Sequence, residues 1–136
     1  MVRRAAGTRG DRLKLQADAP TSLNTVTGYG PGFIEVNKSP HQGHLLLMPD
    51  IPVQPWPVTA FESLRAEDFD VLLELRAEIV LLGTGRRQRF PNPRLTTGLA
   101  RAGIGLEVMD TAAACRTYNI LMSEGRRVLA AFLQEE

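Results

Sequence analysis

The chain has 136 residues, of which 43% are hydrophobic and 23% are charged. This length is typical of one domain, and the composition excludes a chain that is disordered throughout, a disulfide-rich scaffold and a membrane span of about 20 apolar residues. Sixteen Lys and Arg against fifteen Asp and Glu give a net charge of +1, so we expect no nucleic-acid partner. Because Cys115 is the single cysteine, an intrachain disulfide is impossible and a reducing compartment, the cytoplasm, is indicated.

The first half of the chain carries short strand signals separated by glycine and proline. Residues 1–12 are basic and lack an apolar stretch, so we expect a disordered tail before a single domain at 13–136. Glycines at 28, 30 and 32 predict a bulge or tight bend, and the four prolines between 49 and 57 exclude a central strand. In chain order we expect strands at 13–17, 33–36 and 45–48, with a turn at 37–43.

The second half alternates helical and strand patterns. Apolar residues at helical spacing predict a helix at 66–75, and Pro93 and Gly103 bound a second helix at 94–102. Asp110 as N-cap and Gly125 just past the end delimit a third helix at 111–124. Strands are expected at 78–82, 104–108 and 128–133. The pattern predicts an α+β domain with a mixed sheet and a β-rich first half.

Gly83, Thr84 and Gly85 follow a buried strand and suggest a dinucleotide turn. That fingerprint requires a third glycine where this chain has Gln88, and Pro91 delays the next helix, so we expect a sharp turn and no cofactor. The arginines that follow have two interpretations. Arg86 and Arg87 bind an anion beside the Gly85 amide, or they belong to a solvated basic loop paired with an acid; we favour the second, with Glu67, Asp68 or Asp70 as the acid.

The helix at 111–124 places Cys115 and Tyr118 on one apolar face that we expect to pack on the sheet. Cys115 is interpreted as a buried core residue and not as a nucleophile. Asn119 lies at the edge of that face, where it forms either a structural tie, for example to the backbone of 83–86, or a ligand contact. His41 and His44 fit a polar turn better than a metal site, since no third ligand stands at matching spacing.

Four stretches carry a family resemblance: VTGYG at 26–30, LLGTG at 81–85, RQRFP at 87–91 and MDTAAACRTYNILMSEGRR at 109–127. They resemble the small domain-of-unknown-function family that includes mitochondrial complex I assembly factor 3 and the adipogenesis-associated protein of mammals. The resemblance implies a three-layer β/β/α fold with a hammerhead-like β arrangement in the first half, and it implies no established catalysis. Because a transit peptide is not evident, the bacterial branch is indicated.

Two hypotheses of function follow. The first is a non-enzymatic interaction protein, assembly-factor-like by analogy with respiratory-complex biogenesis, whose partner is a subunit of a membrane complex. It predicts an exposed apolar or aromatic patch, with Trp56 and the proline-rich edge as candidates. Against this, the interleaving of Ile51, Val53 and Trp56 with the prolines indicates an edge segment folded onto its own core. The alternative is a small-ligand or anion-binding domain, binding or catalytic, with a pocket between the turn at 83–87 and the last helix. The residues expected to line that pocket are Gly83, Thr84, Gly85, Arg86, Tyr118 and Asn119; no catalytic or metal-binding residue is assigned.

Overall fold

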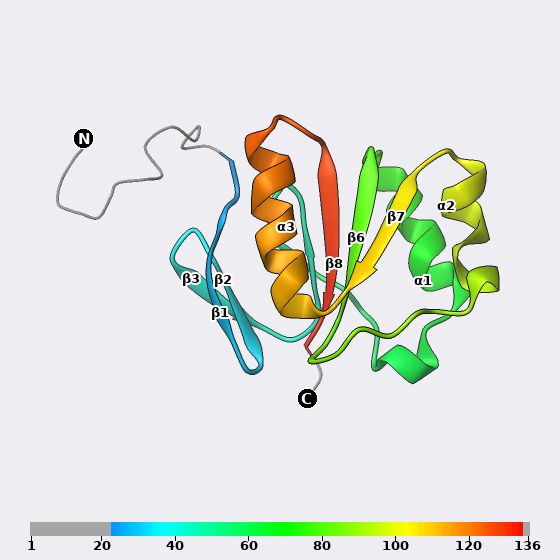
Figure 1. Ribbon diagram of the computed structural model, residues 1–136, viewed down its shortest axis with the longest axis horizontal. Helices are drawn as coiled ribbons and strands as arrows, with labels where there is room; N and C mark the ends of the chain where they lie inside the picture. Colours follow the sequence, from blue (N-terminus) through cyan, green and yellow to red (C-terminus); the bar gives the residue numbers. More distant parts are fainter. Residues whose placement is uncertain (1–22, 135–136) are drawn as a thin grey trace, which may run out of the picture.

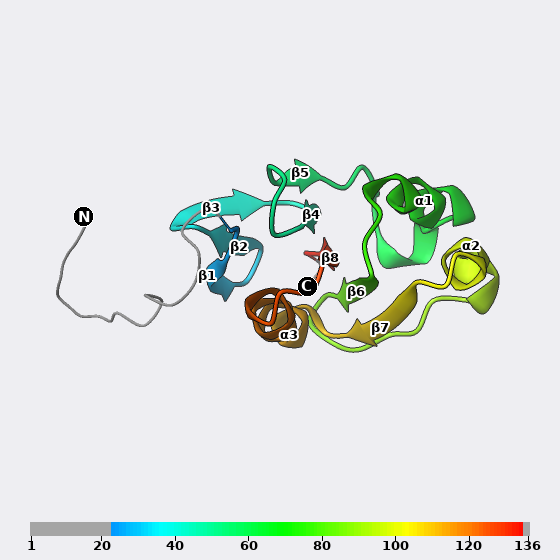
Figure 2. The ribbon, with the colours of Figure 1, turned by 90° about the horizontal axis from the view of Figure 1, so that it is seen from above.

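A five-stranded mixed sheet forms the middle of the fold (Figures 1 and 2). The structure is a computed structural model and describes residues 23–134, so the expected tail and the expected strand at 13–17 lie outside the described residues. The strands lie in the order β5 (Gln54–Pro55), β4 (Leu45–Leu47), β8 (Val128–Leu133), β6 (Ile79–Thr84) and β7 (Gly105–Met109). β6 is parallel to β7 and β8, and β4 is antiparallel to β5 and β8, which makes the sheet mixed.

Strand β8 lies in the centre and is buried along its whole length. Val128, Ala130 and Phe132 enter one hydrophobic cluster, while the residues between them enter the cluster on the opposite face. A continuous apolar run is what a strand covered on both faces requires. Of the four prolines between 49 and 57, Pro55 lies in the edge strand β5 and none lies in a central strand, as the sequence predicts.

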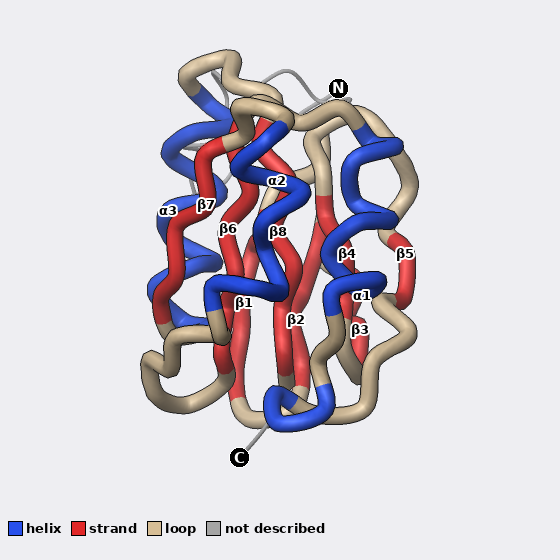
Figure 3. Tube along the Cα trace, turned by 90° about the vertical axis from the view of Figure 1, so that its right-hand side faces the viewer, coloured by secondary structure: helices blue, strands red, loops and turns tan. Residues whose placement is uncertain are grey.

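One face of the sheet is covered by short helices: α1 (Ala66–Asp70), the 3-10 helices η2 (Phe61–Ser63), η3 (Val71–Leu75) and η4 (Pro93–Thr96), and α2 (Thr97–Arg101) (Figure 3). Trp56 belongs to this core. Its side chain is 2% exposed, its ring meets Phe69 edge-on at 5.9 Å, and its indole N–H donates to the Asp68 carbonyl. The prediction that Trp56 forms an exposed patch is therefore wrong, because the proline-rich segment folds back over the sheet.

The opposite face carries α3 (Thr111–Ser123) and a three-stranded antiparallel sheet (Figure 2). That sheet consists of β1 (Val26–Gly30), β2 (Phe33–Val36) and β3 (Ser39–Gln42). The expected bulge lies between Val26 and Gly28. The segment 37–43 differs from the expected turn: Asn37 and Lys38 adopt positive φ as a two-residue hairpin loop, so the residues after them pair with β2.

Helix α3 has the boundaries that its end residues dictate. The Asp110 carboxylate accepts a hydrogen bond from the Ala113 amide at 2.8 Å, and Gly125 closes the helix with a φ of +82°. Its buried face includes Cys115 and Tyr118 and packs on the sheet. Short helices, a mixed sheet, and α3 with the second sheet thus form three layers, which confirms the expected α+β class.

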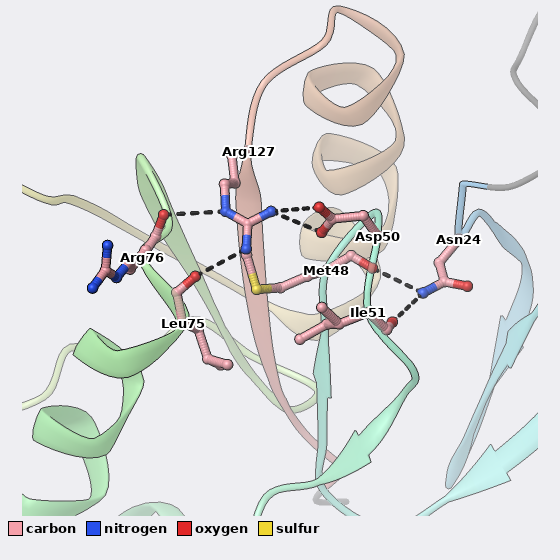
Figure 4. Close-up of polar contacts among 7 residues, drawn as sticks. All are labelled: Asn24, Met48, Asp50, Ile51, Leu75, Arg76 and Arg127. Atoms are coloured by element: carbon pink, nitrogen blue, oxygen red, sulfur yellow. Dashed lines mark hydrogen bonds and ion pairs between the residues drawn. The ribbon is translucent and has the colours of Figure 1, made fainter.

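The Arg127 side chain links several segments at the amino end of the parallel strands (Figure 4). Its Nη1 lies 2.8 and 2.7 Å from the two carboxylate oxygens of Asp50, which precedes β5. Its Nε and Nη2 donate to the carbonyls of Arg76 and Leu75 at the end of η3, each at 3.2 Å. One guanidinium therefore joins β8 to a loop and a helix end that are 51 to 77 residues away in sequence.

Candidate functional site

A cavity of about 530 Å³ opens at the carboxyl end of β6 and β8. Figure 1 shows the tip of the β1–β2 hairpin and the start of α3 at this same end of the molecule. Open α/β sheets commonly place ligand sites at such strand ends. The walls are the hairpin tip (residues 29–33), Gly85 and Arg86 after β6, Thr111 and Ala112 at the start of α3, and Leu133 and Gln134 at the end of β8.

Thr111 fixes the wall between the two parallel strands. Its hydroxyl accepts a hydrogen bond from the Gly85 amide at 2.8 Å and donates one to the Leu133 carbonyl at 2.7 Å. Its own amide donates to the Gly85 carbonyl at 2.9 Å. Gly85 adopts a φ of +93°, which a residue with a side chain would adopt only with strain. The cavity wall is therefore held by bonds among β6, α3 and β8.

Gly83 lets α3 approach the sheet closely. A Cβ at this position would lie 3.0 Å from the Thr111 Oγ1, 3.1 Å from the Thr111 Cα and 3.2 Å from the Ala114 Cβ. The glycine is thus required for packing behind the cavity wall, and it does not line the cavity itself.

Thr84 fixes the basic loop (residues 86–92) through hydrogen bonds to the loop backbone. Its buried hydroxyl lies 2.6 Å from the Arg87 carbonyl and accepts a hydrogen bond from the Arg89 amide at 3.1 Å. The Arg89 guanidinium donates to the Thr84 carbonyl, contacts Glu62 at 3.1 Å and lies 4.5 Å above the ring of Phe61. The acid beside this loop is therefore Glu62. Helix η2 carries that acid to the loop, which corrects the expected pairing with residues 67, 68 or 70.

Tyr118 and Asn119 lie away from the cavity. The phenol donates to the Asn24 carbonyl at 2.8 Å, and burial raises the pKa of Tyr118 well above its usual range. The Asn119 carboxamide accepts from the Val26 amide at 2.9 Å and donates to the Val26 carbonyl at 2.8 Å. Asn119 is thus a structural tie to β1, and the expected bond to the backbone of 83–86 is wrong.

The six residues expected at the site therefore separate into three groups. Gly85 and Arg86 line the cavity, Gly83 and Thr84 support its wall, and Tyr118 and Asn119 hold β1 on α3. Sequence reasoning missed the hairpin tip and the end of β8. The signal for the hairpin tip was present in the alternating glycines at 28, 30 and 32, which indicated a tight bend but not the element that it faces.

Cys115 is buried beneath a smaller hollow between β1 and α3. Burial raises the pKa of its thiol to about 12, with the nearby Arg116 charge opposing the shift. Arg116 donates to the Tyr29 hydroxyl at 2.8 Å across this hollow. At neutral pH the thiol is protonated and unreactive, as expected for a core cysteine.

His44 is a structural residue in this fold. Its Nδ1 accepts from the Gln134 amide at 3.0 Å, and its Nε2 lies 3.1 Å from the Thr59 carbonyl. Among residues 23–134 no group of three or more His, Cys, Asp or Glu side chains is placed to hold a metal ion. Within the same described part of the chain, no helix has the length and apolar character needed to cross a membrane.

The three-layer fold is similar to that of a solved bacterial protein. The crystal structure of a Bordetella parapertussis protein superposes with a TM-score of 0.79 at 45% sequence identity, covering 84% of this chain and 98% of that one. A family model described as protein of unknown function (DUF498/DUF598) matches residues 26–133. The chain belongs to this family, which confirms the resemblance.

Two curated relatives extend the comparison. The chain is 36% identical over 121 residues to cattle NADH dehydrogenase [ubiquinone] 1 alpha subcomplex assembly factor 3. That match covers 88% of this chain but 65% of the cattle protein, so the chain spans less than two thirds of its relative. An uncharacterised protein of Rhodobacter capsulatus is 38% identical over 108 residues, covering 79% of this chain and 82% of that protein.

Proposed function

We propose that this protein is a non-enzymatic, assembly-factor-like protein that binds a subunit of a membrane-bound respiratory complex during its biogenesis. The observation that carries the proposal is the 36% identity over 88% of the chain to complex I assembly factor 3. The single buried Cys115 is consistent with action in the reducing cytoplasm.

The basic loop offers the surface that such a partner would bind. Phe90 is 71% exposed, the highest value among the large hydrophobic side chains that the structure exposes between residues 23 and 134. Arg86 and Arg87 of the same loop are also exposed, while Arg89 fixes the loop through Thr84. Aromatic and arginine side chains are the residue types that most often dominate protein interfaces, and this exposed loop carries both. The complementary partner surface is an apolar pocket with an acidic rim.

Site-specific crosslinking in the cells that produce the protein tests the proposal. A photoreactive amino acid replaces Phe90, and in a matched control it replaces Val71, which is 51% exposed on η3. We expect position 90 to crosslink a respiratory-complex subunit, identified by mass spectrometry, and position 71 not to do so.

The gene deletion should reduce the assembled complex at least twofold, with recovery by the wild-type chain and not by Phe90→Ser. An unchanged complex level after deletion would contradict the proposal.

A further inference from the structure

We infer that the cavity at the carboxyl end of β6 and β8 binds an apolar carboxylate, meaning one carboxyl group on an aliphatic or aromatic body. The inference does not rest on the assembly role, because it uses only the walls and charges of the cavity. Its volume, about 530 Å³, lies within the range of roughly 300–1,000 Å³ of small-molecule sites.

The walls suit an apolar body. Tyr29, Pro31 and Phe33 of the hairpin tip face Ala112 and Leu133 across the cavity. The Phe33 ring lies directly over Gly30, where an added Cβ would come within 2.6 Å of the ring. The opposite wall is held by the hydrogen bonds of Thr111 described above. The apolar surface is therefore largely formed before any ligand arrives, which reduces the ordering cost of binding.

The polar groups of the cavity are suited to an anion. Of the described residues that line it, Arg86 carries a charge and none is Asp or Glu. The Gln134 side-chain nitrogen is buried and has no hydrogen-bond partner among the described residues. Thr111 and Ala112 belong to the first turn of α3, whose amino end already carries the Asp110 carboxylate, so the positive charge available to a ligand is that of Arg86. A buried donor without a partner is costly, so turning this side chain toward an incoming oxygen would be favourable.

A single carboxylate fits these groups better than a phosphate does. One guanidinium can bind a carboxylate through two parallel hydrogen bonds, and a monoanion balances its one charge. A phosphate dianion would need a second cation. The carboxylate therefore contacts Arg86 at the mouth, while the apolar body lies between the hairpin tip and Leu133.

Binding of octanoate to the full chain, followed by amide NMR titration, tests the site. We expect shifts confined to residues 29–33, 85–86, 111–112 and 133–134. Octanol, which has the same chain length without the charge, should bind at least tenfold more weakly. Arg86→Gln should weaken octanoate at least tenfold and octanol less than twofold, with an unchanged melting temperature. Arg87→Gln is the matched control, since Arg87 does not line the cavity, and it should change octanoate affinity less than twofold.

A second variant and a peptide arm complete the test. Ala112→Leu fills the cavity from a helix position that tolerates leucine, and it should abolish octanoate shifts. The peptide Ala-Ala-Leu with a free carboxyl terminus is compared with its carboxyl amide. Binding of octanoate but not of the peptide identifies a free acid as the ligand. Binding of the free-terminus peptide identifies a protein carboxyl terminus. Either result supports the site if Arg86→Gln weakens that binding. Equal octanoate affinity in Arg86→Gln, or no shifts in the cavity with either probe, would overturn the inference.

Discussion

The carboxamide of Asn119 forms two hydrogen bonds with the backbone of Val26, its amide and its carbonyl, although 93 residues separate the two positions. Next to it the Tyr118 hydroxyl bonds to the carbonyl of Asn24. Helix α3 thereby gives the open edge of β1 the donor and acceptor that a neighbouring strand would have supplied. Side chains of this helix thus hold the three-stranded sheet on the main core, together with the apolar cluster between the two sheets and the bonds of Asn24 to the loop at 48–51.

Asn119→Ala should destabilise the protein by about 2 kcal/mol, because it leaves a backbone donor and acceptor of the buried Val26 unpaired. Urea unfolding followed by circular dichroism measures the change. Ile120→Ala, at a neighbouring position that is 56% exposed, is the control and should change the free energy of unfolding by less than about 0.5 kcal/mol. Equal values for the two variants would show that the Asn119 bonds contribute no net stability.

Gly83→Ala should cost about 1–3 kcal/mol, because the new methyl group meets Thr111 and Ala114 at 3.0–3.2 Å and moves α3 off β6. Gly105→Ala is the matched control on the neighbouring strand: its nearest atom, on Ile79, is 3.9 Å away. We expect Gly105→Ala to be neutral or stabilising by up to about 1 kcal/mol. Thermal unfolding compares them, and a tolerated Gly83→Ala would contradict the close packing.

Local signals were sufficient to predict most of the fold. Asp110 and Gly125 delimit α3 because capping depends on the end residues alone. Alternation of apolar and polar residues identified β2, and continuous apolar runs identified β4, β6 and β8. The segment 37–43 was wrongly predicted as one turn because turn-type residues continue through Ser39, Pro40 and Gly43, whereas pairing with β2 is decided by contacts outside the segment.

The candidate site could be predicted only in part. The turn after β6 was identified because glycine at a strand end has a local meaning, and Gly85 and Arg86 do line the cavity. The hairpin tip reaches the same place through tertiary packing, which no local pattern records. Asn119 was placed correctly at the edge of its helix face, but its partner, Val26, depends on how β1 crosses that helix.

Arg127→Lys should destabilise the protein by about 1–2 kcal/mol, because an ammonium group cannot reach Asp50 and the carbonyls of Leu75 and Arg76 together. Arg126→Lys changes the neighbouring residue, whose contact with Glu78 is about half exposed on each side. That control should cost less than about 1 kcal/mol. Chemical denaturation measures both. A loss for Arg127→Lys no larger than that of the control would mean that the clamp at the amino end of the sheet is dispensable.

Alkaline pH should unfold the protein through two buried acids. The folded chain keeps the Cys115 proton up to a pKa of about 12, whereas the unfolded thiol loses it near pH 9.0. Between these values the unfolded state binds fewer protons, so stability falls with rising pH by about 1.4 kcal/mol per pH unit for each such group. Tyr118 adds to the slope above its ordinary pKa of about 10, because its folded pKa is also raised.

Urea unfolding at several pH values from 8 to 11 measures this slope. Cys115→Ala removes the first contribution and should flatten the slope above pH 9, and Tyr118→Phe should flatten it above pH 10. Each variant lowers stability at pH 7 as well, through a small cavity or the lost bond to Asn24, but that loss is constant with pH. Groups that titrate on the surface affect wild type and variants equally, so the difference in slope isolates the buried acid. Parallel curves for wild type and Cys115→Ala would show that the folded thiol ionises like the unfolded one.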